Sequence, residues 1–365
     1  MLVRLERLDE FARTLAAPFA NARSSWAERK GLLIGLRGED GRVGLGEASP
    51  LPGYSPDSLA EARAALEAFG RRGDLSLDWQ GDWGARVDSL LESIPLQIPS
   101  ARFAVETALL DLVGQALGLP LHRLMGTAPG RVAWAGVIEA SGRSGALERA
   151  RTLIDSGVHT LKVKVDGGAG WPEAISFLRA LRELAGSSVR IRIDANRTMS
   201  ADELRDRLDS LSSVQPEFVE EPGDPDAVAR LSSVPVALAL DESLHGGDAE
   251  ARIAALAGAR SRAREYRFVV LKPTVLGGAR RCLHLARAAR SAGAGVVVSH
   301  TLEGPVAWTA CAALALAVDD GRTAAGLEPH HALGLGRGVR LPNLDGAWIV
   351  PHERPGLGLG AWEVP

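Results

Sequence analysis

From about residue 131 onward, apolar segments of strand length alternate with longer segments rich in Ala, Leu and Arg. Each repeat takes about 20–30 residues, a spacing typical of βα units that build a parallel sheet. The seven candidate strands read RVAWAGVI, HTLKVKV, VRIRIDAN, EFVEEP, VALALDES, RFVVLKPT and GAGVVVSHT, and begin near residues 131, 159, 189, 217, 236, 267 and 293. Seven or eight such units close most naturally into a barrel. An open doubly wound sheet is the competing arrangement, but no GxGxxG follows an early strand.

Charged residues recur on one face of five of these strands. In a barrel strand, alternate residues face the interior and the helix layer. Apolar residues take the helix-facing positions, as Leu161, Val163 and Val165 do in LKVKV. The inward positions are then taken by Lys162, Lys164, Arg192, Asp194, Asn196, Glu220, Asp241 and Lys272. These charges lie near the C-terminal ends of their strands, where barrel enzymes build their active sites.

Three carboxylates, Asp194, Glu220 and Asp241, are expected to converge from three consecutive strands, with lysines on both sides. Such a group cannot stay ionised in a small volume without a cation, and hard oxygen ligands suit Mg²⁺. A divalent cation would stabilise a substrate enolate as a Lewis acid. Lysines near the cation should have lowered pKa values, which suits them to proton transfer. The predicted reaction class is proton abstraction next to a carboxylate.

A structural interpretation of these charges competes with the catalytic one. A single Asp or Lys at a strand end is usually a solvated loop residue, and ion pairs can line a barrel without any catalytic role. Charges of the same parity at the ends of five strands are harder to explain in that way. The constellation therefore favours an active site, although no single member of it does.

The residues before the barrel have a different pattern. Three segments alternate like antiparallel strands, at 2–9, 30–37 and 42–48. GEDGR at 38–42 predicts a hairpin turn between the last two. Ser55-Pro56 predicts a helix that begins there, with Ser55 as the N-cap. A second helix is predicted from Pro99 to about Gly118. The tail after residue 326, rich in Gly and Pro, is predicted to pack back on this α+β unit.

Charge and cysteine content exclude several functional classes. A net charge of −3 gives no reason to expect nucleic acid or an anionic membrane as a partner, so a small-molecule substrate is expected. The two cysteines, Cys282 and Cys311, are too few for a disulfide framework. No uncharged apolar run approaches the ~20 residues of a membrane span, so the expected location is cytoplasmic. The oligomeric state is left open.

The strand-end motifs resemble those of a known family. KxK in the second strand, DxN in the third, EEP in the fourth, DES in the fifth and LKPT in the sixth resemble the enolase superfamily, in its muconate-lactonising-enzyme-like subgroup. The resemblance implies an α/β fold: a (β/α)7β TIM-like barrel with an α+β N-terminal capping domain. It implies a capping domain at 1–125, completed by 328–365, and a catalytic barrel at 126–327.

The resemblance also implies roles for individual residues. Asp194, Glu220 and Asp241 would be the metal ligands, for Mg²⁺ or alternatively Mn²⁺. In EEP the first Glu is the ligand in this family, so the second has no metal role. Lys164 would be the general acid and base, Lys162 a supporting positive charge, and Lys272 the lysine on the opposite face of the substrate.

Three segments resemble one branch of this family, the o-succinylbenzoate synthases. VGLGEASPLPGYSPDSLAEA is similar to their GE-x-(S/A)PLPGFS stretch, PSARFAVETALLDL to their P-S-x-RFA-x-E-x-ALLDL helix, and VVVSHTLEGPVAW to their seventh strand. This resemblance implies dehydration of 2-succinyl-6-hydroxy-2,4-cyclohexadiene-1-carboxylate to o-succinylbenzoate, a hydro-lyase step of menaquinone biosynthesis. Candidate substrate contacts are Asn196, Ser299, Thr301 and Glu303.

Other functions fit the same residues. An N-acylamino-acid racemase or dipeptide epimerase would use Lys164 and Lys272 on opposite faces of a stereocentre. A non-catalytic metal- or ligand-binding protein on the same scaffold is an alternative of another class. His300 faces the same mouth and competes with the lysines as a base, while Trp26 and Arg29 match no motif.

Overall fold

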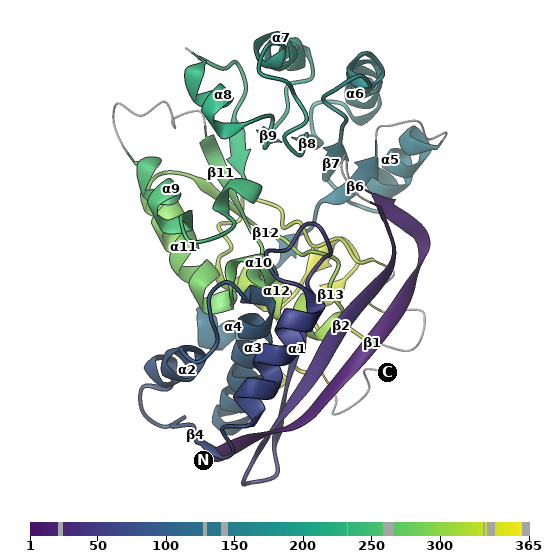
Figure 1. Cartoon of the computed structure of the whole chain (residues 1–365). Coiled ribbons are helices and arrows are strands. Elements are labelled where there is room, and N and C mark those ends of the chain that lie inside the picture. The colour runs from purple at the N-terminus through teal and green to yellow at the C-terminus, as the bar shows by residue number, and fades with distance from the viewer. Residues whose placement is uncertain are drawn as a thin grey trace.

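The computed structural model describes residues 1–20, 25–126, 130–139, 145–231, 233–257, 266–330, 333 and 340–359. Within them lie a four-stranded antiparallel sheet, a seven-stranded parallel sheet and a small three-stranded sheet. Figure 1 shows the antiparallel sheet running along one side of the molecule towards the parallel strands. Among the described helices, none has the length and apolar character needed to cross a membrane.

The antiparallel strands expected at the N-terminus are confirmed. They are β1 (Leu2–Ala20), β2 (Ser25–Gly38), β3 (Val43–Ala48) and β4 (Leu75–Ser76), in the order β3-β2-β1-β4. The first two are longer than the sequence alternation predicts, because β1 and β2 continue to pair as far as Ala20 and Ser25. This two-stranded extension ends beside the C-terminal ends of the parallel strands (Figure 1).

Four helices complete the N-terminal unit: α1 (Leu59–Gly70), α2 (Trp83–Leu91), α3 (Pro99–Leu117) and α4 (Leu121–Met125). The predicted limits of α3 are confirmed, and Gly118 ends it with a φ of 69°. The prediction that Ser55 caps α1 is wrong. Ser58 is the N-cap, in a capping box with Glu61. Ser55 Oγ instead accepts a hydrogen bond from the Leu51 N–H (2.8 Å) inside the preceding turn.

The parallel sheet follows chain order, β6-β7-β8-β9-β10-β11-β12. Its strands are β6 (Gly136–Glu139), β7 (Thr160–Lys164), β8 (Arg190–Asp194), β9 (Phe218–Glu220), β10 (Leu238–Leu240), β11 (Tyr266–Leu271) and β12 (Gly295–Val298). Bridges from Trp134 to Ala325 and from Ser299 to Gly326 connect the two outer strands through residues 325–326. The sheet is therefore curled into a barrel, as the strand–helix alternation predicts.

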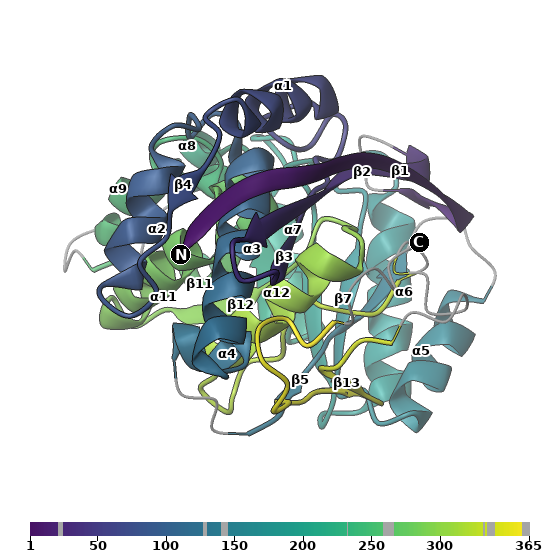
Figure 2. The same cartoon turned by 90° about the horizontal axis from the view of Figure 1, so that it is seen from below.

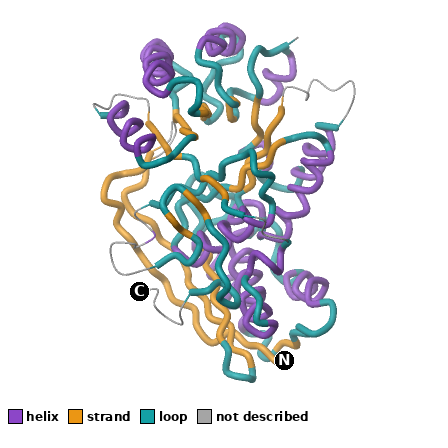
Figure 3. Tube along the Cα trace, turned by 180° about the vertical axis from the view of Figure 1, so that it is seen from behind, coloured by secondary structure: helices purple, strands orange, loops and turns teal. Residues whose placement is uncertain are grey.

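Helices surround this sheet, as Figures 1 and 3 show. They are α5 (Ala146–Asp155), α6 (Trp171–Ala185), α7 (Leu204–Ser210), α8 (Pro225–Arg230), α9 (Ala249–Ala255), α10 (Pro273–Leu276), α11 (Ala279–Ser291) and α12 (Pro305–Ala317), with 3₁₀ turns at Leu211–Ser213 and Glu242–Leu244. Leu161, Val163, Ile191 and Ile193 are fully buried against this helix layer. Helix α12 is buried on nearly every side because it lies between the barrel and the N-terminal unit.

The segment expected to form one long first barrel strand is divided. Its first part, β5 (Val132–Ala133), pairs with β14 (Trp348–Ile349), which also pairs with β13 (Leu344–Asp345). Only its second part, β6, joins the barrel. The tail packs back on the N-terminal unit as predicted, since Leu121 and Leu119 bond Gly356. The tail and α4 are seen from below in Figure 2. The domain limits at 125 and 328 stay a prediction.

Buried carboxylates of the N-terminal unit bind the first turns of barrel helices. Glu47 accepts hydrogen bonds from Gly304 N–H and Ala307 N–H at the start of α12. Glu106 accepts hydrogen bonds from Ala279 N–H and Arg280 N–H at the start of α11. A carboxylate there satisfies N–H groups that a helix leaves unpaired. The two units are thereby fixed relative to each other around the site.

Candidate active site

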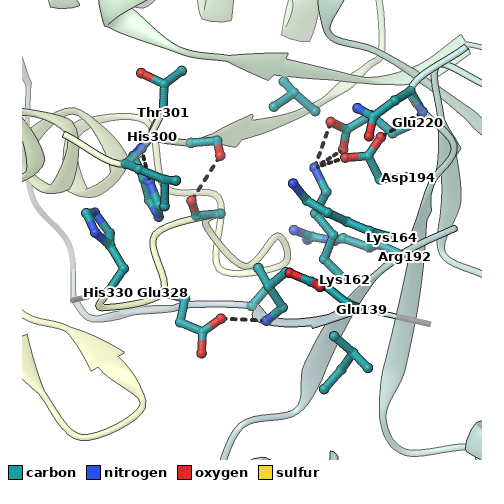
Figure 4. Close-up of a pocket in the computed structure, with 18 of the residues that line it drawn as sticks. Glu139, Lys162, Lys164, Arg192, Asp194, Glu220, His300, Thr301, Glu328 and His330 are labelled. Atoms are coloured by element: carbon teal, nitrogen blue, oxygen red, sulfur yellow. Dashed lines mark hydrogen bonds and ion pairs between the residues drawn. The ribbon is translucent and has the colours of Figure 1, made fainter. Parts of the chain in front are cut away.

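A cavity of about 580 Å³ opens at the C-terminal ends of the barrel strands. Its floor and walls include residues at the ends of six strands, which Figure 4 shows in part. Its cover comes from the N-terminal unit and consists of Leu15, Trp26, Leu51 and Tyr54. Of the residues selected from the sequence, Lys162, Lys164, Asp194, Asn196, Glu220, Lys272, Ser299 and Thr301 line it.

Lys162 lies between two of the predicted metal ligands. Its Nζ is 2.9 Å from Asp194 Oδ2 and 2.8 Å from Glu220 Oε1, and Figure 4 shows the three side chains pointing at one another. Burial alone would lower the pKa of Lys162, but the two carboxylates outweigh burial and raise that pKa above its ordinary value. Lys162 therefore stays protonated and supplies a fixed positive charge.

Lys164, two residues further along β7, has the opposite shift. Burial lowers its pKa to about 8. Asp194 opposes this change, while the positive charges of Lys162 and Lys272 add to it. A lysine with a pKa near 8 can give up its proton close to neutral pH, which a general base requires.

Lys272, which follows β11, pairs with the third predicted ligand. Its ammonium bonds Asp241 Oδ2 and lies 2.5 Å from the Tyr54 hydroxyl oxygen. Burial would lower its pKa, but the negative charge of Asp241 outweighs burial and raises it. Asp241 itself does not line the pocket, and its Oδ2 bonds both of these side chains.

The strand ends that carry the carboxylates have an unusual backbone. Asn196 and Glu221 have φ values of 44° and 42°, in the left-handed region that costs energy for residues other than glycine. The fully buried Glu221 accepts hydrogen bonds from Asp241 N–H (2.8 Å) and Ser243 N–H (2.7 Å). This second Glu of EEP therefore holds the DES turn and does not line the pocket.

Several oxygen atoms at the site are suitable ligands for a hard divalent cation. Asp241 Oδ1, Asn196 Oδ1 and Glu242 Oε2 are buried oxygens without a hydrogen-bond partner, and such atoms are costly unless a ligand or ion completes them. Within the described ranges, however, no three Asp, Glu, His or Cys side chains already surround one point. In this arrangement Lys162 pairs with Glu220, and Lys272 pairs with Asp241.

The opposite end of the cavity contains Glu328 and Arg149, which the strand pattern did not single out, and His300, which was expected to face the same mouth. Glu328, just beyond residues 325–326, accepts a hydrogen bond from Val137 N–H (2.6 Å) and pairs with Arg149. His300 and His330 stack there with ring centroids 4.7 Å apart. Burial lowers the pKa of His300 to about 4, so this histidine is neutral. No local signal reveals Glu328 and Arg149, because barrel closure alone brings them together.

Two of the predicted substrate contacts have partners of their own. Ser299 Oγ lines the cavity and donates to Gly326 O (2.9 Å). Glu303 does not line the cavity: it is fully buried and accepts hydrogen bonds from Thr301 N–H and the Thr274 hydroxyl. Glu303 thus orders the turn after β12 from behind.

Arg29, which matched no motif, connects the two units above the cavity. Its buried guanidinium donates to the carbonyls of Leu302 (2.9 Å), Pro50 (3.2 Å) and Ser49 (2.7 Å). Trp26 Nε1 donates to Pro52 O (3.0 Å) in the same turn. Both side chains hold the 49–55 turn over the pocket.

Lysine content is a further signal in the sequence. Lys and Arg together number 42, yet only four of them are lysines, at 30, 162, 164 and 272. Three of these four line the cavity. Arginine remains charged at any ordinary pH, whereas a lysine can lose its proton. The chain therefore concentrates its titratable amines at this one place.

Models of two domain families match the chain. Residues 7–126 match the mandelate racemase/muconate lactonizing enzyme N-terminal domain, and residues 145–361 match the enolase C-terminal domain-like family. The chain belongs to the enolase superfamily. It is an enzyme of that superfamily's muconate-lactonising-enzyme subgroup, with the capping domain and barrel described above.

Relatives within the superfamily have different activities. The chain is 32% identical to an L-Lys-D/L-Arg epimerase of Methylococcus capsulatus, over 94% of this chain and 95% of the relative. It is 30% identical to an o-succinylbenzoate synthase of Klebsiella pneumoniae, over 84% and 82% of the two chains. The crystal structure of a dipeptide epimerase from Methylococcus capsulatus, complexed with Mg and the dipeptide L-Arg-D-Lys, superposes with a TM-score of 0.81 at 26% identity, covering 98% and 99%.

Proposed function

We propose that this enolase-superfamily enzyme is an o-succinylbenzoate synthase. The observation that carries the proposal is where its synthase-like segment lies. Leu51 and Tyr54, from the PLPGYS stretch that resembles the synthases, cover the cavity. One of the two synthase-like segments of the N-terminal unit thus lies where it would contact a substrate, while the other, in α3, does not line the cavity.

The walls of the cavity also suit this substrate. Ile138, Phe218, Val270 and Val297 provide apolar surface for a flat ring. A dipeptide would bring an ammonium group that needs a carboxylate partner. Among the described lining residues, Glu328 already pairs with Arg149. This ion pair favours a substrate without an ammonium group at that end of the cavity.

In this proposal Lys164 performs both proton transfers. Its neutral amine removes the proton from the ring carbon that bears the carboxylate, and the electrons of that C–H bond move towards the carboxylate. They then return to expel the neighbouring hydroxyl, which takes the proton from the Lys164 ammonium and leaves as water. Lys272 stabilises the charged ring from the other side by a cation–π contact, and Lys162 keeps its positive charge throughout.

Asp194, Glu220 and Asp241 would hold the divalent cation, with Mg²⁺ the first choice because Mg accompanies ligands in similar solved structures. When bound, the cation stabilises the negative charge that develops on the substrate carboxylate. Asn196, Ser299 and Thr301 remain proposed substrate contacts, since all three line the cavity.

An epimerase is the second candidate function. The 32% identity to the L-Lys-D/L-Arg epimerase over nearly the whole chain favours it. Lys164 and Lys272 would then act on opposite faces of one stereocentre. The same ligands and the same first proton transfer serve both reactions, so only the substrate separates them.

One experiment distinguishes the candidates. The enzyme with Mg²⁺ is given the hydroxycyclohexadiene carboxylate, and aromatisation is followed by ultraviolet absorbance. In parallel, dipeptides and N-succinylamino acids are incubated in D₂O, and α-proton exchange is followed by NMR. Aromatisation that is lost in Lys164→Ala supports the synthase. Exchange of amino-acid α-protons without any aromatisation would contradict the synthase assignment and support the epimerase.

A further inference from the structure

Tyr54 differs from the synthase motif that surrounds it. The motif has phenylalanine at the corresponding position of PLPGFS, whereas this chain reads PLPGYS. The additional hydroxyl lies 2.5 Å from Lys272 Nζ and 3.1 Å from Asp241 Oδ2. A phenylalanine could make neither hydrogen bond, so these contacts belong to this chain and not to the motif.

The direction of both hydrogen bonds follows from the partners. An ammonium has no lone pair and can only donate, so Lys272 donates to the phenol oxygen. An ionised carboxylate can only accept, so the phenol gives its single proton to Asp241 Oδ2. The Tyr54 hydroxyl therefore accepts a hydrogen bond from Lys272 and donates one to Asp241.

The ring of Tyr54 is held firmly in this position. The His245 ring meets it edge-on, with centroids 5.1 Å apart and planes at 81°. The turn that bears it is closed by hydrogen bonds from Tyr54 N–H and Ser55 N–H to Leu51 O, at 3.0 and 2.9 Å.

Asp241 is oriented as a consequence. Its Oδ2 bonds Tyr54 and Lys272, while its buried Oδ1 has no hydrogen-bond partner and lies 3.8 Å from His245 Nε2. The carboxylate is thus fixed with one oxygen occupied and one available. Partners that orient a metal ligand in this way affect metal affinity and activity by about 10–100-fold when removed.

We propose that Tyr54 is a positioning residue, which fixes Asp241 to present Oδ1 to the divalent cation and holds Lys272 towards the substrate. The inference rests on the proposed metal-assisted function. Through Tyr54 the N-terminal unit contributes a side chain to the barrel's site.

The first test is Tyr54→Phe, which removes the hydroxyl and keeps the ring. We expect kcat to fall about 10–100-fold with KM changed less than about 3-fold, and Mg²⁺ affinity by calorimetry without substrate to fall about 10-fold. Tyr266→Phe is the matched control, because Tyr266 is the only other tyrosine. Wild-type kcat and Mg²⁺ affinity in Tyr54→Phe, at an unchanged melting temperature, would overturn the proposal.

A second measurement needs no substrate and no destabilised variant. Incorporation of 3-fluorotyrosine gives two ¹⁹F signals, one for each tyrosine, and the control variant Tyr266→Phe assigns them. Titration with Mg²⁺ should shift the Tyr54 signal and leave that of Tyr266 in place. A Tyr54 ¹⁹F signal that does not shift at saturating Mg²⁺ would contradict the inference. If the enzyme turns over no synthase substrate but both Mg²⁺ measurements behave as expected, the synthase assignment fails and the role of Tyr54 stands.

Discussion

Two lysines of one strand have opposite electrostatic surroundings. Lys162 lies between Asp194 and Glu220, and Lys164 is buried with less negative charge around it. Their spacing of two residues puts both on the inner face of β7. The strand thereby carries a permanent cation and a titratable amine side by side, which a proton-transfer site requires.

The pH dependence of turnover follows from Lys164. With a pKa lowered to about 8, this base is protonated and inactive in acid and gains activity as pH rises. We expect log(kcat/KM) to rise with unit slope below pH 8 and to level above it. NMR of protein labelled with ¹⁵N at the lysine side chains can follow the group directly, because the chain has only four lysines. The Lys164 resonance could instead titrate above pH 10 while kcat/KM still falls below pH 8. That result would contradict the assignment of the pH dependence to Lys164.

Some residues of the site can be predicted from the sequence, and others cannot. Lys162, Asp194 and Glu220 could be predicted because period-two alternation puts them on one face of successive strands. Glu328 and Arg149 could not, because they are 179 positions apart and meet only when the barrel closes. Arg29 has no periodic signature either, since its partners are backbone carbonyls.

At the scale of elements, the start of α1 shows how local chemistry decides a boundary. Ser55-Pro56 and Ser58 both satisfy the simplest N-cap rule, but only Ser58 has a glutamate three residues later. We expect Ser58→Ala to lower the free energy of unfolding by about 1 kcal/mol in urea denaturation. Ser55→Ala is the comparison for the turn alone and should leave the helix cap intact. Equal unfolding curves for wild type and Ser58→Ala would show that the cap contributes nothing.

The strands also show where sequence reasoning fails. The barrel strands were found because each is short, buried and followed by a helix. The division of the first strand into β5 and β6 was missed, because β5 pairs with β14 more than 200 residues away. The local pattern of apolar and polar residues contains no information about a partner strand so far away in the chain.

The contact of Glu106 with the start of α11 predicts a pH-dependent stability. Burial raises its pKa from 4.5 to about 7, although the Ala279 and Arg280 N–H groups oppose the shift. A carboxyl with a raised folded pKa contributes stability that is present below pH 4.5 and is lost as pH rises through 7. The change is about 3 kcal/mol at most. Unfolding free energies of Glu106→Gln at pH 5 and 8 should differ less than those of wild type; an identical pH dependence contradicts this origin.

At the scale of the molecule, Arg29 ties the capping unit to the barrel. Arg29→Met leaves the buried carbonyls of Ser49, Pro50 and Leu302 without their donor, which should destabilise the protein by about 3 kcal/mol. Arg29→Lys should not restore the loss, because one ammonium cannot span all three carbonyls. If Tyr54 depends on the same turn, the effects of Arg29→Met and Tyr54→Phe on kcat should be less than additive. Fully additive effects on kcat would show that the two residues act independently.

The response to metal involves the whole fold. Asp194, Glu220 and Asp241 are buried, so a bound cation should stabilise the folded protein by mass action. We expect EDTA to abolish turnover, and 10 mM Mg²⁺ to restore it and raise the melting temperature. Asp241→Asn should lose the thermal shift, while the exposed Asp248→Asn should keep it. A shift of equal size in both variants would place the cation elsewhere.

The concentration of lysines in the cavity has a practical consequence for chemical labelling. Besides the α-amino group, an amine-reactive reagent finds only the half-exposed Lys30 outside the cavity. Lys30→Arg therefore leaves the pocket lysines as the only side-chain amines. Labelling of that variant would report access to the pocket, and protection by a ligand would identify what fills it. A compound library could be screened in this way before any natural substrate is in hand.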